Sequence, residues 1–376
     1  MQFTINRNLF IENLNNVMRA ISSRAAIPIL AGIKIDLFED ELILTGSDTD
    51  ISIEIKLPAS EDLTINSTGS IILTARFFSE IIKKLPGKDF SFEVTTGNQV
   101  RIKSENSEFT INGYDAETYP RLPEITDESA FLIGGKVLRE IINETQFAVA
   151  TQESRLILSG VHFTFDPDAI KAVATDSHRL AERKINLENG PKVTTDLIIP
   201  GRNLQELSRI IGEADPDVQV CPGENQVLFK IGNISFYSRL LEGNYPDTDR
   251  LLPIESTTTV EFDLAELSSA LDRASLLTHA GRNNVVDLEL DTENQKVKLT
   301  GTSAEIGNVE EEVSFRALEG SQLKISFNPD YLRDALRASV TDAVVMKFTQ
   351  PLRPFTVTPN KADIQFIQLI TPVRTF

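Results

Sequence analysis

The chain has 376 residues, of which 41% are apolar and 24% are charged, and its formal net charge is -18. This composition excludes a disordered or fibrous chain, and the length predicts two or three domains. The single cysteine excludes an internal disulfide, and no window approaches the ~18 consecutive apolar residues of a membrane-spanning helix.

The amino-terminal segment MQFTINRNLF has no basic stretch followed by a long apolar run, so we expect a soluble, cytoplasmic protein. The negative net charge argues against a nucleic-acid partner, because phosphate binding needs lysine and arginine to displace counterions. Such a partner would require a local basic surface.

Six apolar residues, each at the end of a short strand, mark a repeat along the chain. Apolar residues recur five and, in all but one case, nine positions later, and seven positions later the residue is acidic in five of the six repeats. Positions five and nine share one face of a helix and position seven lies opposite, so we predict six amphipathic helices whose acids point away from the core. The strand-end residues are Ile5, Leu73, Ile133, Ile199, Phe262 and Phe327.

The predicted helix starts carry residues that favour this position. Asn6, Thr74, Asp263 and Asn328 are good N-caps, and Pro329 stands at the first helical position. We therefore expect a helix directly after each of these caps.

Alternating apolar residues around turn residues predict antiparallel hairpins between the helices, as in IKIDLFEDELILTG and VDLELDTENQKVKLTG. Each unit is thus one strand, one helix and about three strands, and two units make a two-layer α+β domain. We predict three tandem domains at residues 1–125, 126–253 and 254–376. The linkers would be the proline-rich segments 118–129 and 244–257.

The predicted helical layer is less acidic than the rest of the chain, so it is the candidate nucleic-acid face. Its most basic patch contains Arg76, Lys83, Lys84 and Lys88. The alternative is an ordinary solvated helix face. The acids at position seven fit only a loose, water-mediated contact with DNA.

The segment VATDSHRLA places Asp176, Ser177 and His178 side by side, which raises the possibility of a hydrolytic triad. We expect no triad, because adjacent residues on an extended segment point to alternate faces. Three histidines and one cysteine do not make a spaced metal site, and IGGKVL lacks the pattern of a phosphate loop. We therefore expect neither an enzyme nor a bound cofactor or metal.

Several segments in order carry a family resemblance: RAAIPILAGIKI, LTARFFSEIIKKLPG, VATDSHRLA, LEGNYPD, SFNPDYLRDAL and QLITPVRTF. With these segments the whole chain resembles the bacterial DNA polymerase III beta subunit, the sliding clamp. The resemblance implies three DNA-clamp domains per chain, assembled as a head-to-tail dimeric ring with helices inside and sheets outside. A closed ring would hold DNA by topology, which reconciles an acidic chain with a DNA partner.

The same resemblance implies a processivity factor that encircles double-stranded DNA and tethers the replicative DNA polymerase without catalytic activity of its own. A clamp loader would open the ring, and other partners would dock through short peptide motifs. The alternative is a docking scaffold of the same fold that does not encircle DNA.

The resemblance also assigns residues. The peptide-binding pocket would contain Leu158, Thr175, Ser177, His178, Arg179, Leu180, Pro246, Leu251, Asn328, Tyr331, Leu352, Leu369, Thr371, Pro372, Val373 and Arg374. The DNA-facing residues would be Arg24, Arg76, Gln152 and Arg202, and the dimer interface would bring Phe109 and Ile111 against Leu276 and Leu277. Ser177 and Thr371 replace the family's common glycine and methionine, and Leu156 and Ile157 replace paired tyrosines.

Overall fold

The computed structural model describes residues 1–22, 27–188, 190–280 and 284–374. Its contacts divide the chain into two compact units. The first unit contains Met1–Lys136 and Glu206–Leu240, and the second contains Val137–Gln205 and Leu241–Phe376. This division by contacts does not coincide with the predicted linkers and does not test them. The predicted domain boundaries therefore stay a prediction.

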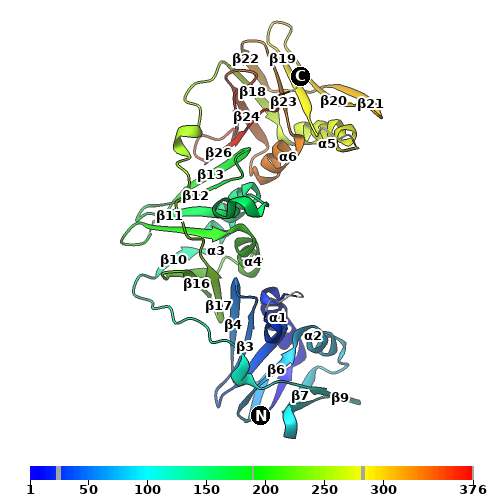
Figure 1. Cartoon of the computed structure of the whole chain (residues 1–376), viewed down its shortest axis with the longest axis vertical. Coiled ribbons are helices and arrows are strands. Elements are labelled where there is room, and N and C mark those ends of the chain that lie inside the picture. The colour runs from blue at the N-terminus through cyan, green and yellow to red at the C-terminus, as the bar shows by residue number, and fades with distance from the viewer. Residues whose placement is uncertain (23–26, 189, 281–283, 375–376) are drawn as a thin grey trace. The chain divides into compact units, whose positions relative to one another are not determined.

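Six α-helices occur in the described residues, and each begins within two residues of the end of a strand (Figure 1). They are α1 (Arg7–Val17), α2 (Ala75–Lys84), α3 (Gly135–Thr145), α4 (Gly201–Ile211), α5 (Leu264–Ala280) and α6 (Pro329–Ala338). All the residues five and nine positions after the strand ends are buried. The predicted period and its burial are therefore confirmed.

The helix caps agree with the prediction at three positions of four. The side chain of Asn6 accepts hydrogen bonds from the amides of Asn8 and Leu9, and those of Asp263 and Asn328 do the same at the starts of α5 and α6. Thr74 precedes α2 without a side-chain cap bond.

The first unit contains two antiparallel sheets. One has the order β5 (Leu63–Ser67), β1 (Gln2–Asn6), β7 (Asp89–Val94), β8 (Gln99–Ser104), β9 (Ser107–Asn112). The other has the order β10 (Phe131–Gly134), β15 (Asp217–Pro222), β16 (Gln226–Ile231), β17 (Ile234–Arg239), β4 (Ile51–Pro58), β3 (Glu41–Ser47), β2 (Gly32–Leu37), β6 (Gly69–Thr74).

The second unit also contains two antiparallel sheets. One has the order β14 (Thr195–Pro200), β11 (Gly160–Phe165), β12 (Ala169–Thr175), β13 (Arg179–Asn186), β26 (Gln365–Ile370), β25 (Phe355–Pro359), β24 (Ala343–Phe348), β18 (Thr258–Asp263), β22 (Ala317–Gly320). The other has the order β21 (Gly307–Glu312), β20 (Lys296–Ser303), β19 (Val286–Asp291), β23 (Leu323–Phe327).

The large sheet in each unit joins strands of two predicted domains. β17 pairs with β4, so that Tyr237 lies opposite Ser52, and β13 pairs with β26, so that Leu180 lies opposite Leu369. Backbone hydrogen bonds therefore cross both predicted linkers, which the sequence alone did not predict.

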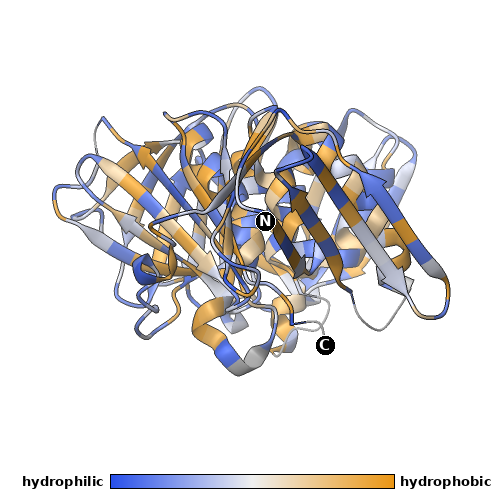
Figure 2. Cartoon of the chain, turned by 90° about the horizontal axis from the view of Figure 1, so that it is seen from above, coloured by the Kyte–Doolittle hydropathy of each residue, from blue (hydrophilic) through white to orange (hydrophobic). Residues whose placement is uncertain are grey.

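Apolar residues alternate with polar residues along the strands, as the orange and blue bands in Figure 2 show. The inward residues of the first unit include a cluster of phenylalanine rings with centroids 4.8–6.4 Å apart. Its members are Phe3, Phe10, Phe78, Phe90 and Phe92, all at most 1% exposed. No helix of the described residues is long and apolar enough to cross a membrane.

Cys221 lies in β15 with 0% of its surface exposed. Burial, together with the nearby Asp127 carboxylate, raises the pKa of its thiol to about 11. Because the thiolate is the reactive form, we expect native protein at pH 8 to react with iodoacetamide far more slowly than protein in urea, as measured by intact mass over time. Equal rates in the two conditions would contradict this prediction.

Candidate functional site

The candidate pocket begins at the turn between β12 and β13. The carboxylate of Asp176 accepts hydrogen bonds from the amides of His178 and Arg179, both at 2.9 Å, and Thr175 Oγ1 donates to the Arg179 carbonyl at 2.7 Å. Ser177 has a φ of 77°. The segment is therefore a tight turn, and the expectation of an extended segment is wrong because Asp176 folds it back on itself.

The same contacts leave no triad. The second Asp176 oxygen accepts from Arg179 Nε at 3.1 Å, and Ser177 Oγ accepts a hydrogen bond from Arg155. The His178 ring stacks on Tyr331 with centroids 6.4 Å apart. The side chains of Asp176 and His178 therefore contact Arg179 and Tyr331 instead of forming the serine–histidine–aspartate chain of hydrogen bonds that a triad needs.

The floor of the pocket is apolar. Val173, Leu180 and Leu369 form a buried cluster, against which Tyr245 and Leu252 pack. The Tyr245 hydroxyl accepts from the amide of Thr175 at 3.1 Å, which fixes the ring against the turn. This apolar cluster is therefore already packed beside the turn, as the base of an apolar ligand site would be.

One wall of the pocket is held by Arg179. Its guanidinium pairs with Asp176 at 3.1 Å and with Asp334 of α6 at 2.6 Å. It also lies over the Tyr331 ring, 4.9 Å from the centroid. Charge, hydrogen bonding and stacking together fix the position of this wall.

The remaining assigned residues differ in burial and in the contacts that fix them. Backbone hydrogen bonds fix the carboxyl-terminal segment, from the Thr371 amide to the His178 carbonyl at 2.9 Å and from the Val373 amide to the Ser326 carbonyl at 2.7 Å. Leu158 is buried, and Asn328 caps α6. The exposed members are Pro246, Leu251, Leu352 and Arg374, while Pro372 is half-buried.

Three floor residues were not predicted from the sequence: Val173, Tyr245 and Leu252. Leu252 rather than Leu251 packs against the cluster, and Leu251 is 51% exposed. The sequence does not indicate which of two neighbouring leucines in an irregular segment points inward.

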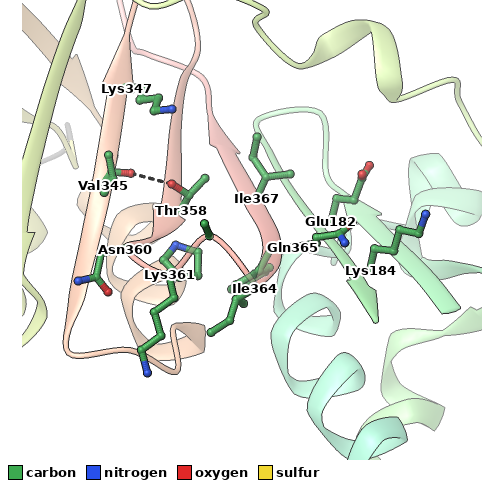
Figure 3. Close-up of a pocket in the computed structure, with 13 residues that line it drawn as sticks. Glu182, Lys184, Val345, Lys347, Thr358, Asn360, Lys361, Ile364, Gln365 and Ile367 are labelled. Carbon is green, nitrogen blue, oxygen red and sulfur yellow. Dashed lines mark hydrogen bonds between the residues drawn. The ribbon is translucent and has the colours of Figure 1, made fainter. Parts of the chain in front are cut away.

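A groove of ≈ 470 Å³ lies on the same sheet (Figure 3). Leu180, Glu182 and Lys184 share one face of β13 because side chains alternate along a strand, so the groove and the pocket floor lie on one face. Lys184, Lys347 and Lys361 line the groove and make no ion pair within the described residues. This lysine groove could not be predicted from the sequence, because its lysines come from separate strands and a loop.

The assigned DNA-facing residues lie at exposed positions where they are described. Arg76 and Arg202 occupy the first turns of α2 and α4, and Gln152 precedes a short 3₁₀ helix, Glu153–Ser159. The Arg76 side chain is 84% exposed and lies 3.6 Å from Glu80. Arg24 lies outside the described residues.

Three of the acids at position seven do not face solvent freely, which corrects the expectation for them. Glu140 pairs with Arg183 at 2.8 Å, Asp334 pairs with Arg179 at 2.6 Å, and Glu206 pairs with Arg19 at 3.0 Å. These acids neutralise arginines of the scaffold, so they do not stand against a DNA surface as free charges.

The assigned interface residues lie at two edges. Phe109, 38% exposed, and Ile111 lie on β9, and no described strand pairs with the outer side of β9. Leu276, 70% exposed, and Leu277 lie on α5, which packs against the edge strand β21. Each unit therefore presents an open strand edge with apolar residues on or beside it.

Repeats of one helix on antiparallel strands, with a buried apolar cluster beside the β12–β13 turn, define a protein of the DNA-clamp class. Family models for the DNA polymerase III beta subunit match residues 1–123 (N-terminal domain), 133–247 (central domain) and 249–374 (C-terminal domain). The chain belongs to the DNA polymerase III beta subunit family.

Individual relatives agree over their full lengths. The beta sliding clamp of Staphylococcus epidermidis is 47% identical over 380 residues, covering 100% of both chains. The crystal structure of the DNA polymerase III beta chain of Streptococcus pneumoniae matches with a TM-score of 0.96 at 44% identity, again over 100% of both chains. That of a Pseudomonas aeruginosa sliding clamp bound to griselimycin matches with a TM-score of 0.92 at 26% identity over 100% of both.

These matches make the chain a sliding clamp, an accessory subunit that supports processive DNA replication.

Proposed function

We propose that two copies of this chain close head to tail into a ring around duplex DNA, and that partner proteins dock on it through the pocket of Leu180 and Leu369. The observation that carries the ring is the pair of open edges, β9 in the first unit and β21 in the second. Because the two edges differ, each copy offers one to its partner and receives the other, and two identical seams close the ring.

Retention on DNA then depends on closure rather than on affinity. The chain has a net charge of -18, so phosphate contacts by a few arginines such as Arg76 and Arg202 supply only weak attraction. Weak contacts leave the ring free to slide while it stays linked to the duplex. The chain itself has no catalytic role and needs no cofactor in this mechanism, which we place in the cytoplasm.

The pocket supplies the specific attachment. Its floor accepts apolar side chains, and the turn and tail around it offer backbone and charged groups that orient a peptide. The replicative polymerase, the clamp loader and other clamp-binding proteins would each present a short peptide to this site, one at a time.

Ring closure is tested with Ile111→Ala combined with Leu277→Ala. We expect sedimentation to show a shift from dimer to monomer, because the double change removes apolar contacts from both sides of each seam. Leu132→Ala combined with Val193→Ala is the matched control, since both residues are exposed outside the proposed seam, at 58% and 74%. Unchanged sedimentation of the interface variant would place the seam elsewhere.

The ring itself is tested by loading the protein on nicked circular plasmid with the clamp loader and then cutting the plasmid once. We expect the wild-type chain to stay on circles through gel filtration and to leave after the cut, and the interface variant to be lost from both. Equal behaviour on circular and linear DNA would favour a docking scaffold that does not encircle DNA.

A further inference from the structure

The turn between β3 and β4 in the first unit has the same construction as the β12–β13 turn of the peptide-binding pocket. The Asp48 carboxylate accepts from the amides of Asp50 at 3.0 Å and Ile51 at 2.9 Å. Ser47 Oγ bonds to the Ile51 carbonyl at 3.3 Å and to the Thr49 amide at 3.3 Å. Thr49 has a φ of 83°, close to the 77° in the other turn.

The segment before the preceding strand also repeats. Leu30 stands in the sequence ILAG before Gly32, and Leu158 stands in ILSG before Gly160. Both glycines end a 3₁₀ helix with φ -105° and ψ 159°, and both leucines are at most 5% exposed. A buried leucine therefore lies at the same place beside each turn.

A tyrosine followed by proline completes both sites. Tyr119, 6% exposed, packs on Leu30, just as Tyr245 packs on the floor of the peptide-binding pocket. Burial is the main cause that raises the pKa of both phenols. The Tyr245 hydroxyl accepts from the Thr175 amide, whereas the Tyr119 hydroxyl has no hydrogen-bond partner within the described residues.

The strand pairing gives the correspondence residue by residue. Ser52 of β4 lies opposite Tyr237 of β17, as Leu180 of β13 lies opposite Leu369 of β26. Both members of the first pair line a cavity of ≈ 170 Å³, large enough for one or two side chains. We call this cavity the β3–β4 pocket; its lining includes Ile27, Asp50, Ser52, Arg121, Tyr237 and Arg239.

The differences between the two pockets define a different ligand. Ser52 and Tyr237 replace two leucines, which makes the floor less apolar and leaves room beside Ile27, which is 43% exposed. Arg121 and Arg239 are exposed residues of the lining and make no ion pair within the described residues, so two cations face the single acid of the lining, Asp50. Arginine forks pair best with carboxylates, and an exposed isoleucine suits one apolar side chain.

We propose that the β3–β4 pocket is a second docking site, which binds an acidic peptide through one apolar side chain between Ile27 and Tyr237 and through carboxylates at Arg121 and Arg239. The inference rests on the proposed function in one respect, that the corresponding pocket in the second unit binds peptides. It gives each chain two peptide sites of different charge preference, so that two partners can occupy one chain together.

The test uses an acidic pentapeptide amide, Asp-Glu-Leu-X-Asp, in which X is the photo-crosslinker benzoylphenylalanine. The full-length protein is irradiated with the peptide, and crosslinked tryptic fragments are quantified by mass spectrometry. We expect crosslinks in fragments that contain residues 119–123 or Tyr237. Arg121→Glu combined with Arg239→Glu should reduce them at least tenfold, and Lys56→Glu combined with Lys103→Glu, equal in charge change and exposed elsewhere in the unit, should not.

The two sites are separated by Leu369→Ala, which should reduce crosslinks around residues 173–180 and leave those of the β3–β4 pocket unchanged. Crosslinks confined to the second unit would overturn the β3–β4 pocket and leave the proposed function intact. Crosslinks confined to the β3–β4 pocket would support it and count against the peptide site in the second unit. Crosslinks at neither site, or equal loss in the lysine control, would overturn this inference.

Discussion

Replacing Arg183 with alanine is expected to lower the free energy of unfolding of the second unit by about 3–5 kcal/mol, the usual cost of leaving a buried charge without its partner. Arg183 Nε donates to Glu144 at 2.6 Å and Nη2 donates to Glu140 at 2.8 Å. Its Nη1 also donates to the carbonyls of Lys184 at 2.9 Å and Gln365 at 3.3 Å. The change therefore removes four bonds, two of which reach the neighbouring backbone of β13 and β26.

The pH dependence follows from Glu144, which is 2% exposed. Burial raises the pKa of this carboxyl from 4.5 to about 7, against the opposing effect of Arg183. Because the folded pKa is the higher one, the stability that this group contributes is fully present below pH 4.5 and is lost as the pH rises through about 7. Without Arg183 the loss on raising the pH should be larger.

Urea unfolding of wild type and variant at pH 5 and pH 8 measures both effects. Glu144→Gln in the Arg183→Ala background should recover part of the stability at pH 8, because it removes the unpaired charge. Arg101→Ala is the control, since Arg101 is half-exposed and its pairs with Glu93 and Glu108 are surface pairs worth about 0–1 kcal/mol. A loss no larger than that of the control would show that the buried network is not stabilising.

Replacing Leu369 with alanine is expected to weaken binding of a partner peptide about 30-fold, the effect of ~2 kcal/mol for an apolar anchor site. Leu369 is 5% exposed and forms the floor of the pocket with Leu180 and Val173. Truncation of Leu369 widens the floor and removes contacts that it would make with an apolar side chain of the peptide.

Fluorescence anisotropy with a labelled peptide from the clamp-binding segment of the cognate polymerase measures this loss. Ile367→Ala is the matched control, because Ile367 is on the same face of β26 two residues earlier and lines the lysine groove instead. We expect its peptide affinity to stay within about twofold of wild type, as for most residues outside an interface centre. Equal losses in both variants would argue for a general effect on β26 rather than for the pocket.

The helices could be predicted from the sequence because their signals are local. Phe10 and Leu14 lie four residues apart on one buried face, and Asn6 caps the first turn by reaching only two and three residues ahead. Thr74 stands at an equivalent position without a cap bond. Position in the chain thus predicts where a helix begins, while the bond itself depends on the local rotamer.

The contacts that build the site could not be predicted, because their partners are distant in the chain. Arg179 and Asp334 are 155 residues apart, and Arg183 and Glu140 are 43 apart. From the sequence these acids are simply charges on the outer side of a helix. The turn at Asp176 could not be predicted for a different reason, since one side-chain bond to the backbone decides between a turn and an extended strand.

The pairing of β13 with β26 fixes which side chains form the pocket floor. Leu369 faces the floor opposite Leu180, whereas its neighbour Gln368 points to the other face, is 1% exposed and donates to the Ala335 carbonyl at 3.1 Å. A single residue inserted or deleted within either strand would exchange these two faces. In β26, Leu369 would then leave the floor and the buried Gln368 amide would take its place. We therefore expect insertions and deletions to be tolerated in the loops of this sheet but to disrupt the floor when they fall within these two strands, even where every inserted side chain is apolar.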